Sequence, residues 1–358
     1  MHIPDGYLSP QTAGGLWALM VPVWYAAGYK VKKTLSARQA PLVAIAAAFS
    51  FVIMMFNLPL PGGTTGHAVG GTIIAIIIGP WAAVIAISVS LTIQALFFGD
   101  GGILALGANC FNIGFVLPVT GYYTYRLLSR GAAEDSPRRW FAAGIGAYVG
   151  LNLAALITAV EFGLQGDLFK AADGSALYSP YGLSTAIPAM MIPHMAVVGV
   201  IEAVMTSLIF VFLLRNNPSL LHSYDGIRAA ATGRLQLKPL LIGMALLLVC
   251  VPLGLLATGS AWGEWGAEEI QADVGYVPQG MDRYLGRWSG ILPDYAFPAA
   301  EEADTGEEPA GAVSLEGVKE SVPGYMVSGV VGLALVGGLA WFSTRLLTRR
   351  SRKKEQLD

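Results

Sequence analysis

The sequence predicts an all-α polytopic membrane protein, and three of its features lead to that prediction. Of its 358 residues only 13% are charged and 54% are apolar, and the mean hydropathy is +0.57; a soluble domain carries about 25% charged residues. The charges are clustered, so several apolar runs approach the ~20 residues that cross a bilayer as a helix. The 44 glycines suit helices that pack closely in lipid. A water-soluble globular protein is therefore excluded.

The first four predicted spans lie before residue 99. Apolar stretches between polar markers place them at residues 10–29, 40–57, 68–79 and 80–98. The third is too short to cross a bilayer alone at ~1.5 Å per residue. We therefore expect it and the preceding Thr64–Gly71 segment to form a broken or re-entrant element.

Five more spans follow, at residues 103–126, 140–161, 186–214, 239–258 and 324–343. A basic linker with Pro218, Gly226 and Gly233 separates the first seven spans from the last two. Such a break between two membrane units indicates a fusion of two subunits. The predicted divisions are a seven-span unit at 1–216, a cytoplasmic linker at 217–237, a two-span unit at 238–346 and a basic tail at 347–358.

Basic residues predict the orientation. Four groups hold 18 of the 22 lysines and arginines, within residues 30–38, 126–139, 215–238 and 345–354. If nine spans alternate, all four groups face one side, and basic loops mark the cytoplasm. We expect a multi-pass protein of the cell (inner) membrane with its N-terminus outside and its C-terminus cytoplasmic.

The predicted external loop, residues 260–323, is acidic. It holds 13 of the 24 acidic residues and only three basic ones. Its run Ala299–Gly311 has the composition of a flexible segment. Two interpretations remain open, a solvated tether and a surface that concentrates cations.

Several functions lack the residues they need. The net charge of −2 gives no support for a nucleic-acid partner, and Cys110 and Cys250 lie in apolar runs, so no disulfide framework is expected. No HExxH, GxxxxGK[ST] or GxSxG motif occurs. The chain is therefore not expected to be an enzyme, and any ATP hydrolysis must occur in a partner.

The first two residues form a candidate metal site. No Lys or Arg precedes Lys30, so no cleavable signal peptide is expected, and the bulky His2 should protect Met1 from removal. A free α-amine, with a pKa near ~7.7–8, can lose its proton and bind a metal. The Met1 amine, the His2 amide nitrogen and the His2 imidazole would close fused five- and six-membered chelate rings on one ion. Such a planar nitrogen set suits Ni(II) or Cu(II) and can suit Co(II).

His67 is the candidate for the fourth ligand. It lies in a glycine-rich loop that permits close approach by another segment, and the predicted topology puts it on the same side as Met1. Thr65 and Gly66 are expected to support the site, and Asp5 either orients a ligand imidazole or caps the first helix. The alternatives are a frayed terminus at His2 and a hydrogen-bonding role for His67.

Other polar residues within the predicted spans are expected to make packing contacts. His194 and Glu202 lie about 80° apart around one helix, so we do not expect them to share an ion. Asn109, Asn112 and Asn152 are expected to hydrogen-bond between helices.

Two segments resemble the hallmark sequences of a transporter family. MHIPDGYL at residues 1–8 and GGTTGH at residues 62–67 are similar to those of the substrate-capture subunit (CbiM/NikM family) of cobalt/nickel energy-coupling-factor (ECF) transporters. Supporting similarities extend the resemblance to about residue 215. Residues 239–343, with Pro293-Asp294-Tyr295, resemble the two-span accessory subunit (CbiN/NikN-like) of the same systems.

The resemblance implies the S component of an ATP-driven importer for Ni(II) and/or Co(II), in systems that include cobalamin biosynthesis. It implies that Met1, His2 and His67 bind the ion outside the cell. The implied partners are two cytoplasmic ATPase subunits and a transmembrane coupling subunit; the ion is cargo, and no cofactor is expected. The competing class is an ATP-independent divalent-cation channel or secondary carrier, in which only Glu202 with His194 could form a relay.

Overall fold

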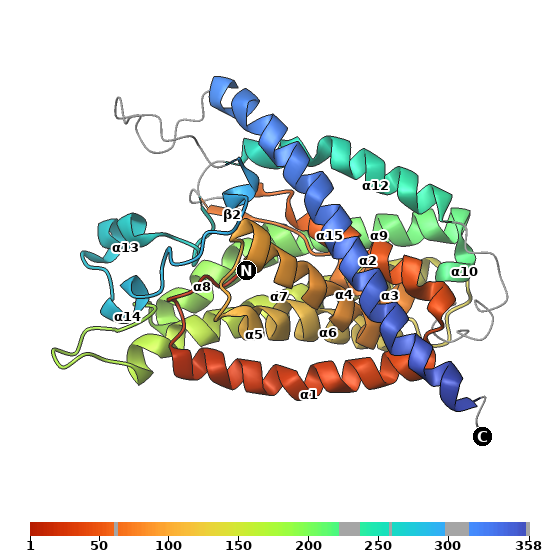
Figure 1. The fold of residues 1–358 in the computed structure, drawn as a ribbon, viewed down its shortest axis with the longest axis horizontal. Coiled ribbons are helices and arrows are strands. Elements are labelled where there is room, and N and C mark those ends of the chain that lie inside the picture. The colour runs from red at the N-terminus through yellow and green to blue at the C-terminus, as the bar shows by residue number, and fades with distance from the viewer. Residues whose placement is uncertain (61–63, 222–236, 258–259, 298–314, 356–358) are drawn as a thin grey trace.

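The computed structural model is a bundle of helices with a small cap, formed by residues 260–297, at one end (Figure 1). It describes residues 1–60, 64–221, 237–257, 260–297 and 315–355. The predicted flexible run Ala299–Gly311 lies outside these residues. The predicted all-α membrane fold is confirmed, since the only strands among the described residues form one short hairpin.

The N-terminal region contains most of the helices. In chain order the elements are α1 (Pro10–Thr34), η1 (Ala37–Gln39), α2 (Ala40–Met54), β1 (Leu58–Leu60), β2 (Thr64–Gly66), α3 (Gly71–Ile78), α4 (Pro80–Ile93), η2 (Gln94–Phe98), α5 (Leu106–Asn109), η3 (Cys110–Val116), α6 (Leu117–Leu128), α7 (Pro137–Leu168), α8 (Leu183–Pro193), η4 (His194–Val198), α9 (Gly199–Asn216) and α10 (Pro218–Leu221). The segments η2, η3 and η4 are π-helical turns that continue their neighbouring α-helices.

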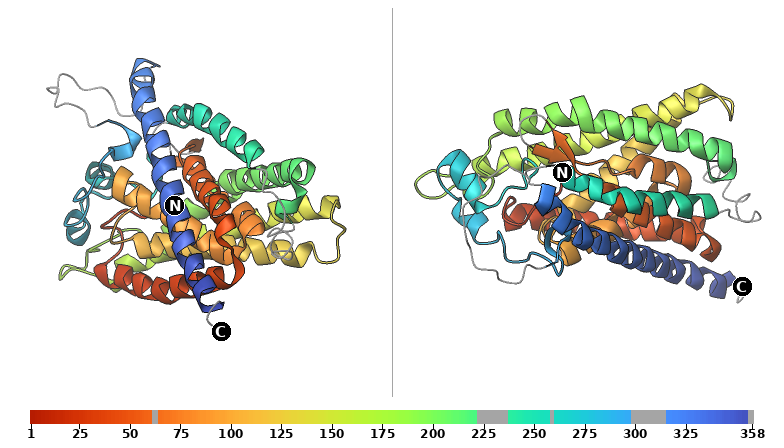
Figure 2. Two further views of the ribbon diagram at one scale, coloured as in Figure 1. Left: turned by 45° about the vertical axis from the view of Figure 1, so that its right-hand side comes forward. Right: turned by 90° about the horizontal axis from the view of Figure 1, so that it is seen from above.

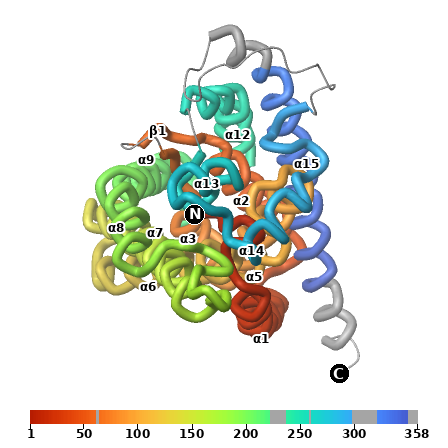
Figure 3. Tube along the Cα trace, turned by 90° about the vertical axis from the view of Figure 1, so that its left-hand side faces the viewer, coloured from red at the N-terminus to blue at the C-terminus, as the bar shows by residue number. Residues whose placement is uncertain are grey.

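The C-terminal region forms two long helices and the cap. Its elements are α12 (Lys238–Cys250), η5 (Val251–Leu256), α13 (Ala267–Val274), α14 (Gln279–Asp282), η6 (Pro293–Tyr295) and α15 (Leu315–Glu355). Figure 2 shows α15 along the outer face of the bundle. Figure 3, drawn from the end that carries α13 and α14, places the N-terminus near the middle of the helices.

Among the described residues, six helical stretches are long and apolar enough to cross a membrane. They are Ala37–Met54, Pro80–Phe98, Pro137–Leu168, Leu183–Asn216, Lys238–Leu256 and Ser321–Thr348, and each coincides with a predicted span. The other predicted spans fall on α1, on the continuous α5–η3–α6 segment and on α3. Helix α3 has eight residues and is almost wholly buried, which agrees with the prediction that it cannot cross alone. The total of nine spans stays a prediction.

Glycines allow α6 and α7 to pack closely. A Cβ atom at Gly146 would lie 2.5 Å from the Gly121 carbonyl oxygen, and one at Gly150 would lie 2.5 Å from the Leu117 carbonyl oxygen. Any side chain there would separate the two helices. This close approach is the use of glycine that the composition predicted.

The first helix begins later than Asp5. Ser9 is its N-cap, since the Ser9 hydroxyl accepts a hydrogen bond from the Thr12 backbone nitrogen at 3.1 Å, and Pro10 occupies the first turn. The prediction that Asp5 caps this helix is therefore wrong. Residues 1–8 therefore precede the helix, and they can fold back into the bundle.

Candidate metal site

The N-terminus is folded into the bundle. Met1 is 6% exposed, His2 2% and Ile3 0%. Asn109 at the end of α5 holds this segment in two directions: its side chain accepts from the Ile3 nitrogen at 2.8 Å and donates to the Ile3 oxygen at 3.1 Å. The frayed-terminus alternative is therefore wrong. Asn109 binds the terminal segment instead of a neighbouring span, which corrects the prediction made for it.

Asp5 anchors the terminal segment to the loop before α5. Its carboxylate accepts hydrogen bonds from the Ile103 and Ala105 backbone nitrogens, each at 3.1 Å. Burial raises the pKa of the Asp5 carboxyl, and these backbone hydrogen bonds oppose that rise. Neither predicted role for Asp5 is observed: it neither caps α1 nor orients an imidazole.

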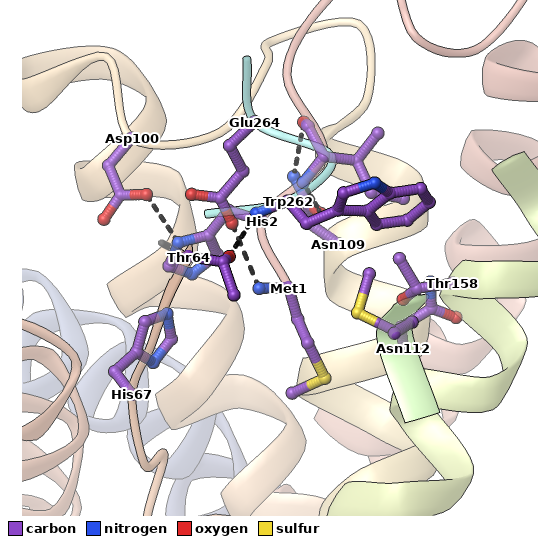
Figure 4. Close-up of polar contacts among 12 residues, drawn as sticks. Met1, His2, Thr64, His67, Asp100, Asn109, Asn112, Thr158, Trp262 and Glu264 are labelled. Carbon is purple, nitrogen blue, oxygen red and sulfur yellow. Dashed lines mark hydrogen bonds and ion pairs between the residues drawn. The ribbon is translucent and has the colours of Figure 1, made fainter. Parts of the chain in front are cut away.

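His67 lies next to His2, as Figure 4 shows. The centroids of the two rings are 4.9 Å apart, with an angle of 31° between the ring planes. His67 Nδ1 lies 3.1 Å from the Ala68 carbonyl oxygen, which can only accept a hydrogen bond. Nδ1 therefore carries the proton, and the lone pair is on Nε2.

The remaining predicted support residues, Thr65 and Gly66, lie in β2, two residues and one residue before His67. Strand β2 pairs antiparallel with β1. Thr65 and Gly66 are buried, so the strand fixes the start of the His67 loop. The side chain in β2 that reaches another region is Thr64, whose hydroxyl accepts from the Trp262 backbone nitrogen at 2.6 Å.

Two carboxylates that sequence reasoning missed contact the predicted ligands. His2 Nδ1 lies 2.5 Å from Asp100 Oδ1, and the Met1 amine donates to Glu264 Oε1 at 3.0 Å. The local signal for Asp100 was its position as the only acidic residue among the glycines after residue 98. Nothing local distinguished Glu264 from the other acids of the external loop.

Asp100 is held from three sides. Its Oδ2 accepts hydrogen bonds from the Tyr295 hydroxyl at 2.5 Å and from Gln94 Nε2 at 3.1 Å. Burial raises the pKa of the Asp100 carboxyl, but the charge of His2 and the hydrogen bonds from His2 and Tyr295 outweigh that effect and hold the pKa below its ordinary value. The Asp100 carboxylate is therefore a fixed negative charge beside the two histidines.

His67 is held neutral. Burial lowers the pKa of its imidazole well below the ordinary value, and repulsion from His2 and from the N-terminal amine lowers it further. A neutral imidazole is the form that binds a metal.

The cap, residues 260–297 of the C-terminal region, covers this site. Tyr295, which binds Asp100, and its neighbour Asp294 both adopt positive φ angles, of 63° and 50°. The Tyr7 hydroxyl donates to the Trp265 carbonyl oxygen at 2.9 Å, and the Trp262 ring packs 6.0 Å from the Phe162 ring. The predicted accessory unit thus covers the candidate site and contributes the Glu264 carboxylate to it.

The site contains nitrogen atoms that can bind a cation, and the carboxylates of Asp100 and Glu264 contact two of these nitrogens. The described residues contain no group of three His, Cys, Asp or Glu side chains arranged to hold a metal. The predicted ligand set differs from such a group, because two of its nitrogens, the Met1 amine and the His2 amide, belong to the main chain. A metal bound by the predicted chelate would have to displace Glu264 from the Met1 amine and Asp100 from His2 Nδ1.

The other intramembrane polar residues lie away from this ligand set. His194 Nδ1 lies 2.7 Å from the Met190 carbonyl oxygen, and Glu202 accepts hydrogen bonds from backbone nitrogens of the His67 loop. Asn112 makes the predicted contact between helices, donating to Glu161 at 2.7 Å. Asn152 instead donates within its own helix, to the Tyr148 oxygen at 2.8 Å, so the prediction for Asn152 is wrong.

Two family models match the chain. The model described as the cobalt uptake substrate-specific transmembrane region, CbiM, matches residues 2–220. The model of the PDGLE domain matches residues 238–349. Together they cover both membrane units that the sequence predicted.

Similar proteins carry the same fusion or the first unit alone. The chain is 46% identical over 368 residues to the fused nickel transport protein NikMN of Rhodobacter capsulatus, with 98% of this chain and 100% of that protein covered. A crystal structure of a truncated transition metal transporter is 54% identical, with a TM-score of 0.57, and covers 60% of this chain and 99% of its own. A second, of a transition metal transporter, is 52% identical with the same TM-score and covers 63% of this chain.

Proposed function

This chain belongs to the CbiM family, fused to a PDGLE domain, and we propose that it captures Ni(II) or Co(II) outside the cell for an ECF-type importer. It is a membrane-embedded subunit of a metal transporter. The finer proposal is that four nitrogens bind the ion: the Met1 amine, the His2 amide and imidazole, and His67 Nε2.

One observation carries the proposal. Two histidines separated by 65 positions in the sequence have their rings 4.9 Å apart, both buried, with the N-terminal amine in the same site. His67 Nδ1 is committed to a backbone oxygen, which leaves Nε2 to bind a metal. A buried imidazole with one nitrogen held by a backbone oxygen, as in His67, is the second-shell pattern that accompanies imidazole ligands.

Capture requires an exchange of partners. The five- and six-membered chelate rings use His2 Nδ1, the atom that contacts Asp100. An arriving dication displaces the protons from the amine, the amide and Nδ1. Asp100 and Glu264 then remain beside the ion as negative charges, which offset its charge in a buried site.

The nitrogen set also determines which ions bind. Nitrogen donors favour Ni(II) and Co(II) over Mg(II) and Ca(II), which prefer oxygen, and over Cu(I), which prefers sulfur. Cu(II) binds nitrogen sites more strongly still, so availability has to exclude it.

The proposed assembly adds a transmembrane coupling subunit and two cytoplasmic ATPase subunits. Their ATP hydrolysis would open the chelate toward the cytoplasm. The Met1 amine contacts Glu264 of the cap, and the C-terminal end of α15 lies at the opposite end of the bundle from α13, which supports an outside N-terminus and a cytoplasmic C-terminus (Figure 1). A C-terminal reporter should therefore be active only in the cytoplasm of the producing cell.

The test compares Ni(II) and Co(II) uptake in cells that produce the chain with and without its ATPase partners. The proposal predicts uptake only when the ATPases are present. Uptake that survives their deletion would favour the competing class, an ATP-independent channel or secondary carrier.

A further inference from the structure

Glu202 is a buried carboxylate with no cationic partner among the described residues. It lies in the first turn of α9, and its exposed fraction is 0%. Its Oε2 accepts a hydrogen bond from the Val69 nitrogen at 2.8 Å, and its Oε1 accepts one from the Gly70 nitrogen at 3.0 Å. A buried charge is costly unless hydrogen bonds compensate it. Here backbone nitrogens of a single loop provide that compensation.

That loop carries the proposed ligand His67. Val69 and Gly70 follow it by two and three positions and lead into α3. Gly70 has a φ of 71°, and a Cβ atom there would lie 2.4 Å from a Phe49 ring carbon. On the other side of the same peptide, the Ser50 hydroxyl donates to the Val69 oxygen at 2.9 Å. The backbone after His67 is therefore fixed by α2 and α9 together.

Helix α9 and the turn before it contact the loop on both sides of His67. A Cβ atom at Gly66 would lie 3.0 Å from Val198 Cγ2, so Val198 packs against the residue that precedes His67. Val198 and Glu202 are four positions apart, which puts them on one face of the helix. Val198 therefore contacts the loop just before His67, and Glu202 binds the loop just after it.

We propose that Glu202 is a positioning residue for metal capture, which holds His67 in the plane of the other ligand nitrogens by binding the backbone of residues 69 and 70. This inference rests on the proposed function. A carboxylate suits the task because Oε2 accepts from both nitrogens and Oε1 accepts from Gly70 as well; a glutamine amide has one acceptor oxygen, and its NH₂ group would face a backbone N–H. Glu202 thereby favours ions that accept planar coordination, such as Ni(II), over tetrahedral Zn(II).

The test uses the purified full-length chain and the substitution Glu202→Gln. We expect Ni(II) affinity to fall at least ~10-fold, the effect of losing a charge-assisted hydrogen bond, and the absorption band of planar Ni(II) to weaken. The matched control is Thr206→Val, one turn further along α9. Thr206 is equally buried and its hydroxyl has no hydrogen-bond partner among the described residues, so this variant should bind Ni(II) like the parent.

A double-mutant cycle with His67→Ala separates positioning from general stability. If Glu202 acts through His67, Glu202→Gln should cost little further affinity once His67 is absent. Equal losses in both backgrounds, or an equal loss in Thr206→Val, would overturn the inference. Should Glu202→Gln fail to fold, Ser50→Ala tests the same peptide, with an expected loss of a few-fold that also disappears in the His67→Ala background. A parent chain that binds no Ni(II) would instead refute the proposed function.

Discussion

The CbiM and PDGLE regions of this chain differ in how they are packed. In the CbiM region, the apolar stretches that contain α2, α4 and α7 are 67%, 67% and 61% buried inside the protein, and the stretch that contains α8 and α9 is 33% buried. In the PDGLE region, the values are 17% for α12 with η5 and 28% for α15. Both PDGLE helices therefore lie at the periphery, as α8 and α9 do, and the polar contacts of the PDGLE region with the candidate site come from residues 260–297, through Glu264 and Tyr295.

The CbiM region therefore contributes to the candidate site through its packed helices, and the PDGLE region contributes through the segment between its two helices. The CbiM region positions the proposed ligand nitrogens by close helix packing. The PDGLE region contributes residues 260–297, which cover the N-terminus at the candidate site.

Removing a ligand imidazole in the CbiM region should have the largest effect. His2→Ala should abolish metal uptake, because it removes one nitrogen and opens the six-membered chelate ring. His67→Ala should cripple uptake, because three nitrogens remain. Initial rates of Ni(II) uptake at equal membrane levels of protein measure both. Normal uptake by His2→Ala would show that the His2 imidazole is not a ligand.

An extra residue between Met1 and His2 should impair uptake nearly as much. The insertion keeps every side chain but adds a second backbone amide to the terminal chelate, so the terminal nitrogens alone can fill four planar positions and exclude His67. Initial rates of Ni(II) uptake measure the effect. An insertion between Ser9 and Pro10 would be a poor control because it disturbs the cap of α1, so the matched control replaces Ile3 with Val and should support normal uptake.

Matched glycines should separate the packing of the two regions. Gly146→Ala should destabilise the protein by about 1–3 kcal/mol, because its Cβ atom would lie 2.5 Å from the Gly121 oxygen in the adjacent helix α6. Gly243→Ala in α12 meets nothing within 4 Å and should not destabilise it. Thermal midpoints in detergent measure both. Equal destabilisation would contradict the packing difference.

The smallest predicted effect is that of Glu264. Glu264→Gln should lower Ni(II) affinity only a few-fold, because it removes one partly exposed charge next to the Met1 amine. Glu268→Gln, an exposed acid of α13, is the matched control and should leave affinity unchanged. If both variants lose affinity equally, the loop acts through its general negative charge and not through the contact of Glu264 with the N-terminus.

Local sequence predicted the helices and the histidines, and it missed long-range partners. Apolar runs between basic clusters located the spans because a bilayer imposes length and hydropathy on each helix separately. Asp100 and Glu264 were missed because their contacts join residues 98 and 263 positions away. The Pro293-Asp294-Tyr295 stretch was singled out, but only the fold shows that Tyr295 binds Asp100. Asp5 was misassigned because Ser9, four positions later, caps the helix.

The central claim is that the N-terminal amine of Met1 is a metal ligand. The most direct test is the Ni(II) content of the purified chain, compared between a free N-terminus and one with a chemically blocked amine. We predict equimolar metal with the free amine and almost none after blocking. Equal metal content in both samples would contradict the account.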